Sequence, residues 1–126
     1  LLNSMTVCVF LFSTHFIRQS VQPSHFVEWL NYATGYDMSL SEFLKTGERI
    51  FNLKRLFNIR RGITSKDDTL PPRILKQMRR SGGTIDDSSP LAEMLAEYYS
   101  YRGWDRDGKP NAGKLIELGL AGKSRP

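Results

Sequence analysis

The feature that most constrains the fold is the segment 39–62, which predicts one long amphipathic helix. Ser39 and Glu42 have the spacing of a capping box, in which two side chains accept hydrogen bonds from backbone N–H groups at a helix start. Gly62 follows Arg60 and Arg61, and a glycine after cations is typical of a helix C-terminus. Apolar residues recur at helical spacing along the segment, namely Leu40, Phe43, Leu44, Gly47, Ile50, Phe51 and Phe57, with Leu53 and Leu56 widening the stripe. This stripe has to be covered, so the segment is the expected centre of the fold.

Shorter helices are expected on both sides of this segment. Pro23 and Ser24 open a helix that Gly35 ends, with apolar residues at Phe26, Trp29, Leu30 and Ala33. Ser89, with Pro90 just inside, starts another helix that ends near Gly103 and has Leu91, Met94, Leu95 and Tyr98 as its inner stripe.

The remaining segments complete an all-α, multihelical prediction. Residues 63–73 form a connector, Asp105–Pro110 a turn and Ala112–Leu118 a last short helix. The apolar run Met5–Phe12 is a short buried strand or helix segment, since its periodicity does not separate the two. At 126 residues the chain is expected to be a single domain, 1–126.

The net charge of +5 is compatible with nucleic acid, an anionic membrane, an acidic protein partner, or solubility alone. The basic stretch interleaves Phe51 and Phe57 with nine cations: Lys54, Arg55, Arg60, Arg61, Lys66, Arg73, Lys76, Arg79 and Arg80. Both Phe residues fall on the predicted core stripe, so they are not available to stack on bases. A solvated or interdomain face is therefore favoured over nucleic-acid binding.

The single cysteine, Cys8, allows no internal disulfide and favours a reducing compartment. The run Met5–Phe12 is too short to span a bilayer and lacks the flanks of a signal peptide. A soluble, cytoplasmic protein without a membrane partner is expected. Between Val7 and Val9, Cys8 by itself is most simply a small buried hydrophobic residue.

Common catalytic and ligand motifs are missing, so no catalytic residue is assigned within this chain. Gly82–Gly83 is not a phosphate loop, and His15 and His25 lack ligand spacing. Asp105–Gly108 is a turn and not a calcium loop, because the twelfth position is Ile116 and not Glu.

Four ordered blocks do point to a family. They read Gly47–Gly62 (GERIFNLKRLFNIRRG), Asp67–Arg73 (DDTLPPR), Met94–Tyr99 (MLAEYY) and Arg102–Asp105 (RGWD) with Gly108 and Pro110, and Leu118–Leu120 follows them. In this order they resemble the C-terminal helical domain of the tungsten- or molybdenum-pterin aldehyde:ferredoxin oxidoreductase family. Together with the start at Leu1, the resemblance implies that the chain is a C-terminal fragment of a larger enzyme.

In that family two pterins hold tungsten or molybdenum beside a 4Fe–4S cluster, aldehydes are oxidised to carboxylic acids, and electrons leave through the cluster to ferredoxin. Three cluster cysteines come from a C-x-x-C-x-x-x-C stretch, and the fourth from a D-x-x-G-L-C segment that also contacts a pterin. Here that segment is Asn3–Cys8 (NSMTVC). The resemblance implies that Cys8 is a cluster ligand and that Asn3 and Val7, which replace the family's Asp and Leu, contact the pterin.

The resemblance also implies what the chain needs from outside. One cysteine cannot hold a four-iron cluster, so the isolated chain is expected to bind no cofactor and to be inactive. Its partners would be the N-terminal domains of the same enzyme, ferredoxin and the aldehyde. The residues alone leave an alternative open, namely a free-standing basic helical module that binds nucleic acid or a protein.

Overall fold

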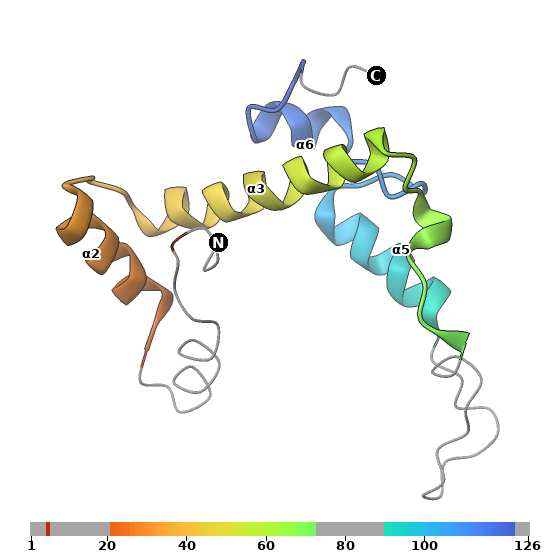
Figure 1. Ribbon diagram of the computed structural model, residues 1–126, viewed down its shortest axis with the longest axis horizontal. Helices are drawn as coiled ribbons and strands as arrows, with labels where there is room; N and C mark the ends of the chain where they lie inside the picture. The colour runs from red at the N-terminus through yellow and green to blue at the C-terminus, as the bar shows by residue number, and fades with distance from the viewer. Residues whose placement is uncertain (1–4, 6–20, 73–89, 123–126) are drawn as a thin grey trace, which may run out of the picture. The chain divides into compact units, whose positions relative to one another are not determined.

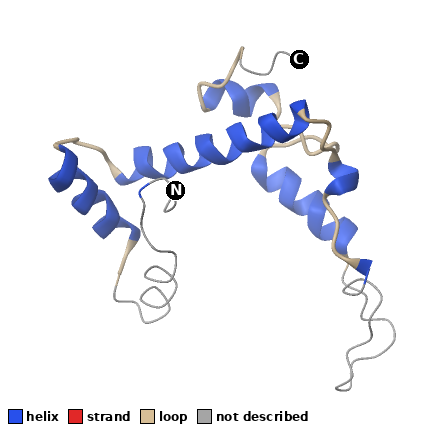
Figure 2. Ribbon diagram, in the orientation of Figure 1, coloured by secondary structure: helices blue, strands red, loops and turns tan. Residues whose placement is uncertain are grey.

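The computed structural model describes residue 5 and residues 21–72 and 90–122 (Figure 1). The elements in these ranges are α2 (Pro23–Thr34), α3 (Leu40–Arg60), the 3₁₀ turn η2 (Ser65–Asp67), α5 (Leu91–Arg102) and α6 (Ala112–Glu117). Figure 2 shows helices and loops in these ranges, where the only β-type pairing is an isolated bridge between Trp104 and Pro110. The all-α prediction is confirmed.

The described residues divide into two compact units between Asn52 and Leu53, and α3 contributes residues to both. Each unit is described by itself below, and the prediction of a single domain over 1–126 stays a prediction. Within the described ranges, no helix combines the length and the apolar character that a membrane span requires.

In the first unit, α2 and the start of α3 enclose a small apolar core. Its buried members are Val21, Phe26, Val27 and Phe43, against which Met5, Leu30 and Met38 pack. The predicted glycine cap of α2 is confirmed: Gly35 has φ +72° and its N–H donates to the Asn31 carbonyl oxygen at 2.8 Å. The Asn31 side-chain Nδ2 donates to the Met38 carbonyl oxygen at 3.0 Å, and its Oδ1 accepts from the Met38 N–H at 3.1 Å. These two hydrogen bonds hold the turn that leads into α3.

The predicted ends of the long helix are confirmed to within two residues. The Ser39 backbone N–H donates to Glu42 Oε2 at 2.9 Å, and the Glu42 N–H donates to Ser39 Oγ at 3.3 Å, so both halves of the capping box form. At the other end, Gly62 adopts φ +88° and donates to the Ile59 carbonyl oxygen at 3.0 Å. Local sequence therefore determines where α3 begins and ends.

The predicted apolar stripe of α3 is wrong for most of its members. Phe43 and Leu56 are buried, but the exposed fractions of Leu40, Leu44, Phe51, Leu53 and Phe57 range from 41 to 62%. Two polar residues, Asn52 and Arg55, are buried instead, and Asn52 Nδ2 donates to the Glu48 carbonyl oxygen at 3.0 Å. Helical spacing shows that apolar residues share a face, but it does not show what covers that face.

In the second unit, α5 begins one residue later than predicted, at Leu91, with Pro90 at the cap position. Ser89, the predicted cap, lies outside the described residues. The predicted inner stripe is wrong for two of its four residues: Met94 and Tyr98 are 54% and 40% exposed, whereas Leu91 and Leu95 are half-buried and Tyr99 is buried. The predicted end is confirmed by Gly103, with φ +66°.

The short helix α6 closes the core of the second unit. Asn111 caps this helix: its side-chain Oδ1 accepts a hydrogen bond from the Lys114 N–H at 2.8 Å, as asparagine commonly does at a helix start. Beyond the helix, Leu118 and Leu120 are fully or nearly fully buried and pack with Leu56 of α3. The C-terminal end of α3 is thereby held by residues about 60 positions later in the chain.

Candidate functional site

The site residues implied by the resemblance, Asn3, Val7 and Cys8, lie outside the described residues. Their roles as pterin contacts and cluster ligand therefore stay predictions. In the ranges that the structure describes, no group of three or more His, Cys, Asp or Glu side chains is placed to hold a metal ion. The described residues instead form a buried polar cluster in the second unit.

This cluster is centred on Arg55 of α3, and we call it the Arg55 cluster: Arg55, Asp68, Tyr99, Trp104 and Gly108. The guanidinium binds Asp68 through two parallel hydrogen bonds, Nη1 to Oδ1 at 2.9 Å and Nη2 to Oδ2 at 2.6 Å. Its Nε donates to the Gly108 carbonyl oxygen at 2.8 Å. Two-point Arg–carboxylate pairs are among the stronger and more directional polar contacts in proteins.

Aromatic side chains complete the Arg55 cluster. The Tyr99 hydroxyl donates to Asp68 Oδ2 at 2.5 Å. The Trp104 ring lies against the guanidinium, with 5.0 Å between Arg55 Cζ and the ring centroid, and its centroid is 5.9 Å from that of Tyr99. The cation is therefore enclosed by a carboxylate, a carbonyl oxygen and a π-face, which compensates for its removal from water.

The connector positions Asp68 through a capped turn. At the start of η2, the N–H of the cap residue Thr64 donates to Asp67 Oδ2 at 2.8 Å, and the Lys66 N–H donates to Thr64 Oγ1 at 3.3 Å. The Asp68 N–H then donates to the Ser65 carbonyl oxygen at 3.2 Å. Of the two adjacent aspartates, Asp67 therefore closes the local turn and Asp68 reaches Arg55.

Gly108 is required where the turn after α5 approaches Arg55. Its φ is +72°, and an added Cβ would lie 2.3 Å from Arg55 Nη2 and 3.1 Å from Tyr99 Cζ. The turn is held by Asp105 Oδ1, which accepts the backbone N–H groups of Asp107 and Lys109, both at 2.9 Å. This confirms the prediction of a turn over Asp105–Pro110.

The charges of the Arg55 cluster are mutually stabilised. The hydrogen bonds from Arg55 lower the pKa of Asp68 below its usual range, and those to Asp68 raise the pKa of Arg55. Burial, reinforced by the Asp68 carboxylate, raises the pKa of Tyr99 to about 12. At neutral pH the carboxylate is thus ionised and the phenol neutral, so neither is poised to exchange protons as an acid–base catalyst does. The cluster is suited to holding the unit together.

Two sequence-based predictions around α3 need correction here. The sequence predicts that Arg55 belongs to a solvated or interdomain basic face, but its side chain is 9% exposed and paired with Asp68. The sequence also predicts that Phe57 lies in the core, but it is 62% exposed. The buried side of α3 in this unit thus contains Arg55 and Leu56, and Phe57 lies outside it.

Every member of the Arg55 cluster belongs to one of the four motif blocks, but the sequence does not join them. The hydrogen bonds of Arg55 and Tyr99 link residues 13, 31 and 53 positions apart. No periodicity connects such separations. The available signal was that the four blocks contain an Arg, an Asp and a Tyr, which are the residue types of a buried ion pair with a hydrogen-bond partner.

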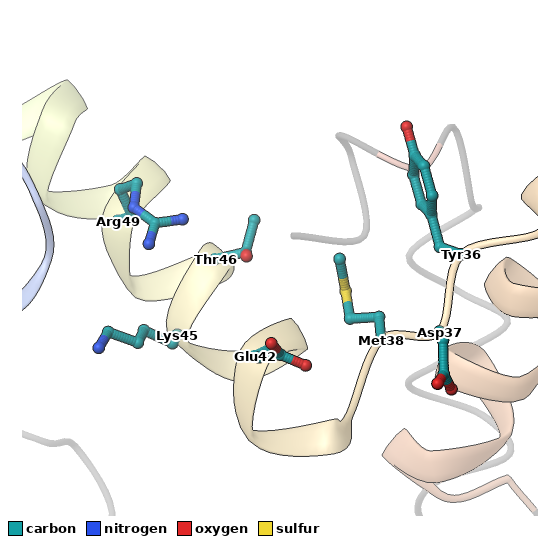
Figure 3. Close-up of a pocket in the computed structure, with 7 residues that line it drawn as sticks. All are labelled: Tyr36, Asp37, Met38, Glu42, Lys45, Thr46 and Arg49. Atoms are coloured by element: carbon teal, nitrogen blue, oxygen red, sulfur yellow. The ribbon is translucent and has the colours of Figure 1, made fainter.

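The first unit contains an open cavity of about 340 Å³, shown in Figure 3, between the turn before α3 and the first turns of that helix. The cavity is lined by two carboxylates, Asp37 and Glu42, and by two cations, Lys45 and Arg49. The other lining residues are Tyr36, Met38 and Thr46. Glu42 is held by Ser39, whose backbone and side-chain hydrogen bonds lower its pKa. Two acids and two bases give the cavity no preference for ligands of either sign.

Comparison with known proteins identifies the family. The family model described as aldehyde ferredoxin oxidoreductase, domains 2 & 3, matches residues 1–120. The chain belongs to the aldehyde ferredoxin oxidoreductase family. This confirms the resemblance inferred from the four motif blocks, and the described part of those blocks contains the Arg55 cluster.

Similar proteins include tungsten-containing aldehyde ferredoxin oxidoreductases from three organisms. The chain is 46% identical over 93 residues to that of Pyrococcus furiosus, 45% over 96 residues to that of Pyrococcus horikoshii and 44% over 95 residues to that of Thermococcus kodakarensis. These alignments cover 73–75% of this chain. The chain spans only 15–16% of the length of each relative.

Proposed function

We propose that this chain is the C-terminal domain of an enzyme that oxidises aldehydes to carboxylic acids and passes the electrons through a 4Fe–4S cluster to ferredoxin. The observation that carries the proposal is the family match over residues 1–120. The identity of about 45% to proteins named as tungsten-containing aldehyde ferredoxin oxidoreductases supports tungsten over molybdenum as the metal. The aldehyde and ferredoxin are proposed partners, and the enzyme is proposed to be cytoplasmic.

Within that enzyme, the proposed contribution of this chain to the cofactors is small and specific. Its single cysteine, Cys8, would be one of four thiolates around the cluster, so three must come from elsewhere in the polypeptide. Asn3 and Val7 would line the adjacent pterin, where the Asn3 amide can form hydrogen bonds without a negative charge. When bound, the metal–pterin group would supply the two-electron oxidation and the cluster the one-electron transfer.

The described residues of the second unit would contribute a packed body of their own to that enzyme. The Arg55 cluster joins α3, the connector after it, α5 and the turn that follows, and all of its charged groups are paired within it. The isolated chain is proposed to be inactive because it brings one cluster ligand and no catalytic residue.

Replacement of Cys8 in the full-length enzyme tests this proposal. Cys8→Ser exchanges a soft thiolate for a hydroxyl that binds iron poorly at almost unchanged volume. We expect loss of the cluster, conversion to a three-iron form or a shifted potential, with a parallel fall in electron transfer to ferredoxin. Iron content and the electron paramagnetic resonance signal of the reduced enzyme measure this.

The matched control is Thr6→Ser, which makes a change of similar size two positions away. It should leave iron content and the resonance signal unaltered. If Cys8→Ser gives the same full iron content and signal as Thr6→Ser, Cys8 is not a ligand and its role is confined to packing.

One observation favours the alternative of a nucleic-acid-binding module. Phe57 is exposed beside Lys54 and Arg60, and exposed aromatic rings among cations are typical of single-strand binding surfaces. We expect any such binding to be weak and steeply salt-dependent. Sub-micromolar affinity for a defined sequence at physiological salt would favour this alternative over the oxidoreductase.

A further inference from the structure

We propose that Tyr98, Trp104 and Tyr99 relay a one-electron oxidising equivalent from the surface of the second unit to a buried tyrosine, whose proton passes to Asp68. We call Tyr98, Trp104 and Tyr99 the aromatic triad. The oxidants that it accepts are oxygen-centred radicals of high reduction potential. This one-electron activity is separate from the proposed oxidation of aldehydes and does not rest on it.

The rings of the aromatic triad are neighbours in space. The ring centroids of Tyr98 and Trp104 are 5.7 Å apart in an edge-to-face arrangement, and those of Trp104 and Tyr99 are 5.9 Å apart. Tyr98 and Tyr99 are also neighbours, at 6.2 Å. All three separations are typical of interacting aromatic pairs. Because electron transfer slows steeply with distance, steps between such rings are fast, and Tyr98 reaches Tyr99 both directly and through Trp104.

Exposure distinguishes the entrance of the aromatic triad from its end. Tyr98 is 40% exposed, so an oxidant can reach its ring and water can take its phenolic proton. Tyr99 is 6% exposed, and its hydroxyl donates to Asp68 Oδ2 at 2.5 Å. The structure describes all five tyrosines of the sequence, and the four others are 40–87% exposed. Tyr99 is therefore the buried tyrosine, and its hydrogen bond provides a proton acceptor away from bulk water.

The hydrogen bond to Asp68 lowers the cost of oxidising Tyr99. A neutral phenol keeps its proton, but loss of an electron makes it a far stronger acid than any carboxylic acid. It therefore protonates Asp68 even though the pairing with Arg55 makes this carboxylate a weaker base than a free one. The Tyr99 phenol and the Asp68 carboxylate become a phenoxyl radical and a carboxylic acid. The electron passes to the oxidant, so that a hydroxyl radical is reduced to hydroxide.

Two guanidinium groups direct the oxidising equivalent away from Trp104. The Cζ atoms of Arg55 and Arg102 lie 5.0 and 5.9 Å from the centroid of the Trp104 ring. A cation over a ring is attracted by the neutral ring and opposes a positive charge on it. A Trp104 radical cation is therefore disfavoured, whereas oxidised Tyr99 is left neutral because its proton departs. Trp104 is thus a step in the relay, and Tyr99 is its end.

The test is photochemical oxidation of the full-length protein that contains this chain. Light and a cobalt(III) ammine acceptor convert ruthenium tris-bipyridine into a one-electron oxidant, which is too large to reach a side chain that is 6% exposed. In samples frozen under illumination, we expect a phenoxyl electron paramagnetic resonance signal in the wild type that is missing from Tyr99→Phe. This variant keeps the ring and the ion pair, and signals common to both samples cancel in the difference. Circular dichroism checks that each variant is folded.

Replacement of Tyr98 tests the entrance. Tyr98→Phe should lose most of the Tyr99 signal, since phenylalanine is much harder to oxidise than tyrosine. The matched control is Tyr101→Phe, which removes an 85% exposed tyrosine of the same helix and should leave the signal unchanged. In Tyr99→Phe, Trp104 should accumulate oxygen adducts, detected by mass spectrometry, because the oxidising equivalent has lost its end point.

Electron–nuclear double resonance on the Tyr99 signal tests the role of Asp68. We expect one exchangeable proton, hydrogen-bonded to the phenoxyl oxygen, and a radical without it would remove Asp68 as the acceptor. Equal spectra of the wild type and Tyr99→Phe would overturn the relay as a whole. Equal signals from Tyr98→Phe and Tyr101→Phe would remove Tyr98 as the entrance, and unchanged adducts at Trp104 in Tyr99→Phe would remove Trp104 from the path.

Discussion

Replacement of Arg55 by methionine should destabilise the second unit more than any change at an exposed cation nearby. Methionine has a similar length and no charge, so it fills the space while removing every polar interaction of the guanidinium. The substitution abolishes the two hydrogen bonds to Asp68, at 2.9 and 2.6 Å, the bond to the Gly108 carbonyl oxygen at 2.8 Å and the stacking on Trp104. Asp68 is then left as a carboxylate with only Tyr99 as its partner in the cluster.

The magnitude follows from the burial of the pair. Removing one partner of a fully buried ion pair costs roughly 3–5 kcal/mol. The Asp68 side chain is 24% exposed, so water can partly solvate the remaining carboxylate, and we expect about 2–3 kcal/mol here. Arg55→Lys keeps the charge but loses the two-point geometry, so its cost should fall between those of the wild type and Arg55→Met.

The assay is urea denaturation of the chain, with far-ultraviolet circular dichroism as the signal that monitors unfolding. With a denaturant dependence of roughly 2 kcal/mol per molar urea, a loss of this size lowers the midpoint by about 1–1.5 M. The matched control is Lys54→Met, which removes the adjacent, exposed cation and should change the free energy of unfolding by less than about 0.5 kcal/mol. Equal midpoints for Arg55→Met and Lys54→Met would refute the reasoning, since the buried pair would then contribute nothing.

The dependence on pH provides a second check of the same variant. Arg55 lowers the pKa of Asp68 in the folded state below the value of about 4 that an aspartate has in the unfolded chain. The pair therefore stabilises the protein fully at a pH above the unfolded pKa. This stabilisation is lost as the pH falls through the folded-state pKa. The difference between wild type and Arg55→Met should therefore be constant around neutral pH and shrink in acid. A difference that grows with acidification would contradict the assignment of the pair.

Two further predictions concern the same cluster. In urea denaturation, Gly108→Ala should lower the free energy of unfolding by about 1–2 kcal/mol more than Gly119→Ala does. Both glycines have positive φ, but only at Gly108 would an added Cβ contact Arg55 and Tyr99. Equal losses for the two variants would mean that Arg55 and Tyr99 move aside at no cost. The phenolate absorbance of the wild type minus that of Tyr99→Phe should show an ionisation near pH 12. Because the pKa of Tyr99 is raised in the folded state, the stabilisation linked to it should be complete below about pH 10 and be lost between pH 10 and pH 12. Titration of the difference signal near pH 10 would show that Tyr99 is neither buried nor bonded to Asp68.

Much of the local structure could be predicted from the sequence, because its causes lie within a few residues. The box formed by Ser39 and Glu42 and the positive-φ glycines Gly35 and Gly103 act through contacts three to five positions apart, and the structure confirms each. The predicted boundaries were less exact at α5, where Pro90 and not Ser89 occupies the cap position.

The candidate site was predictable only through the family. Cys8 was singled out by its place in a motif and not by any pattern of ligands, and its role stays a prediction because it lies outside the described residues. The burial of Arg55 was missed because cations are usually exposed, and only a partner placed by the tertiary structure reverses that tendency.

By itself, therefore, the sequence determined the all-α class, the ends of the helices to within one or two residues, and the family. Each of these depends on short-range interactions or on motifs that can be compared directly. Only the tertiary structure decided which face of each helix is buried. In the structure, Arg55 pairs with Asp68 and Asp68 with Tyr99, across 13 and 31 positions, and Arg55 is buried while Leu53 and Phe57 are exposed. The physical reason is that burial is a property of what packs against a residue, and hydrophobic spacing along one helix carries no information about its partner.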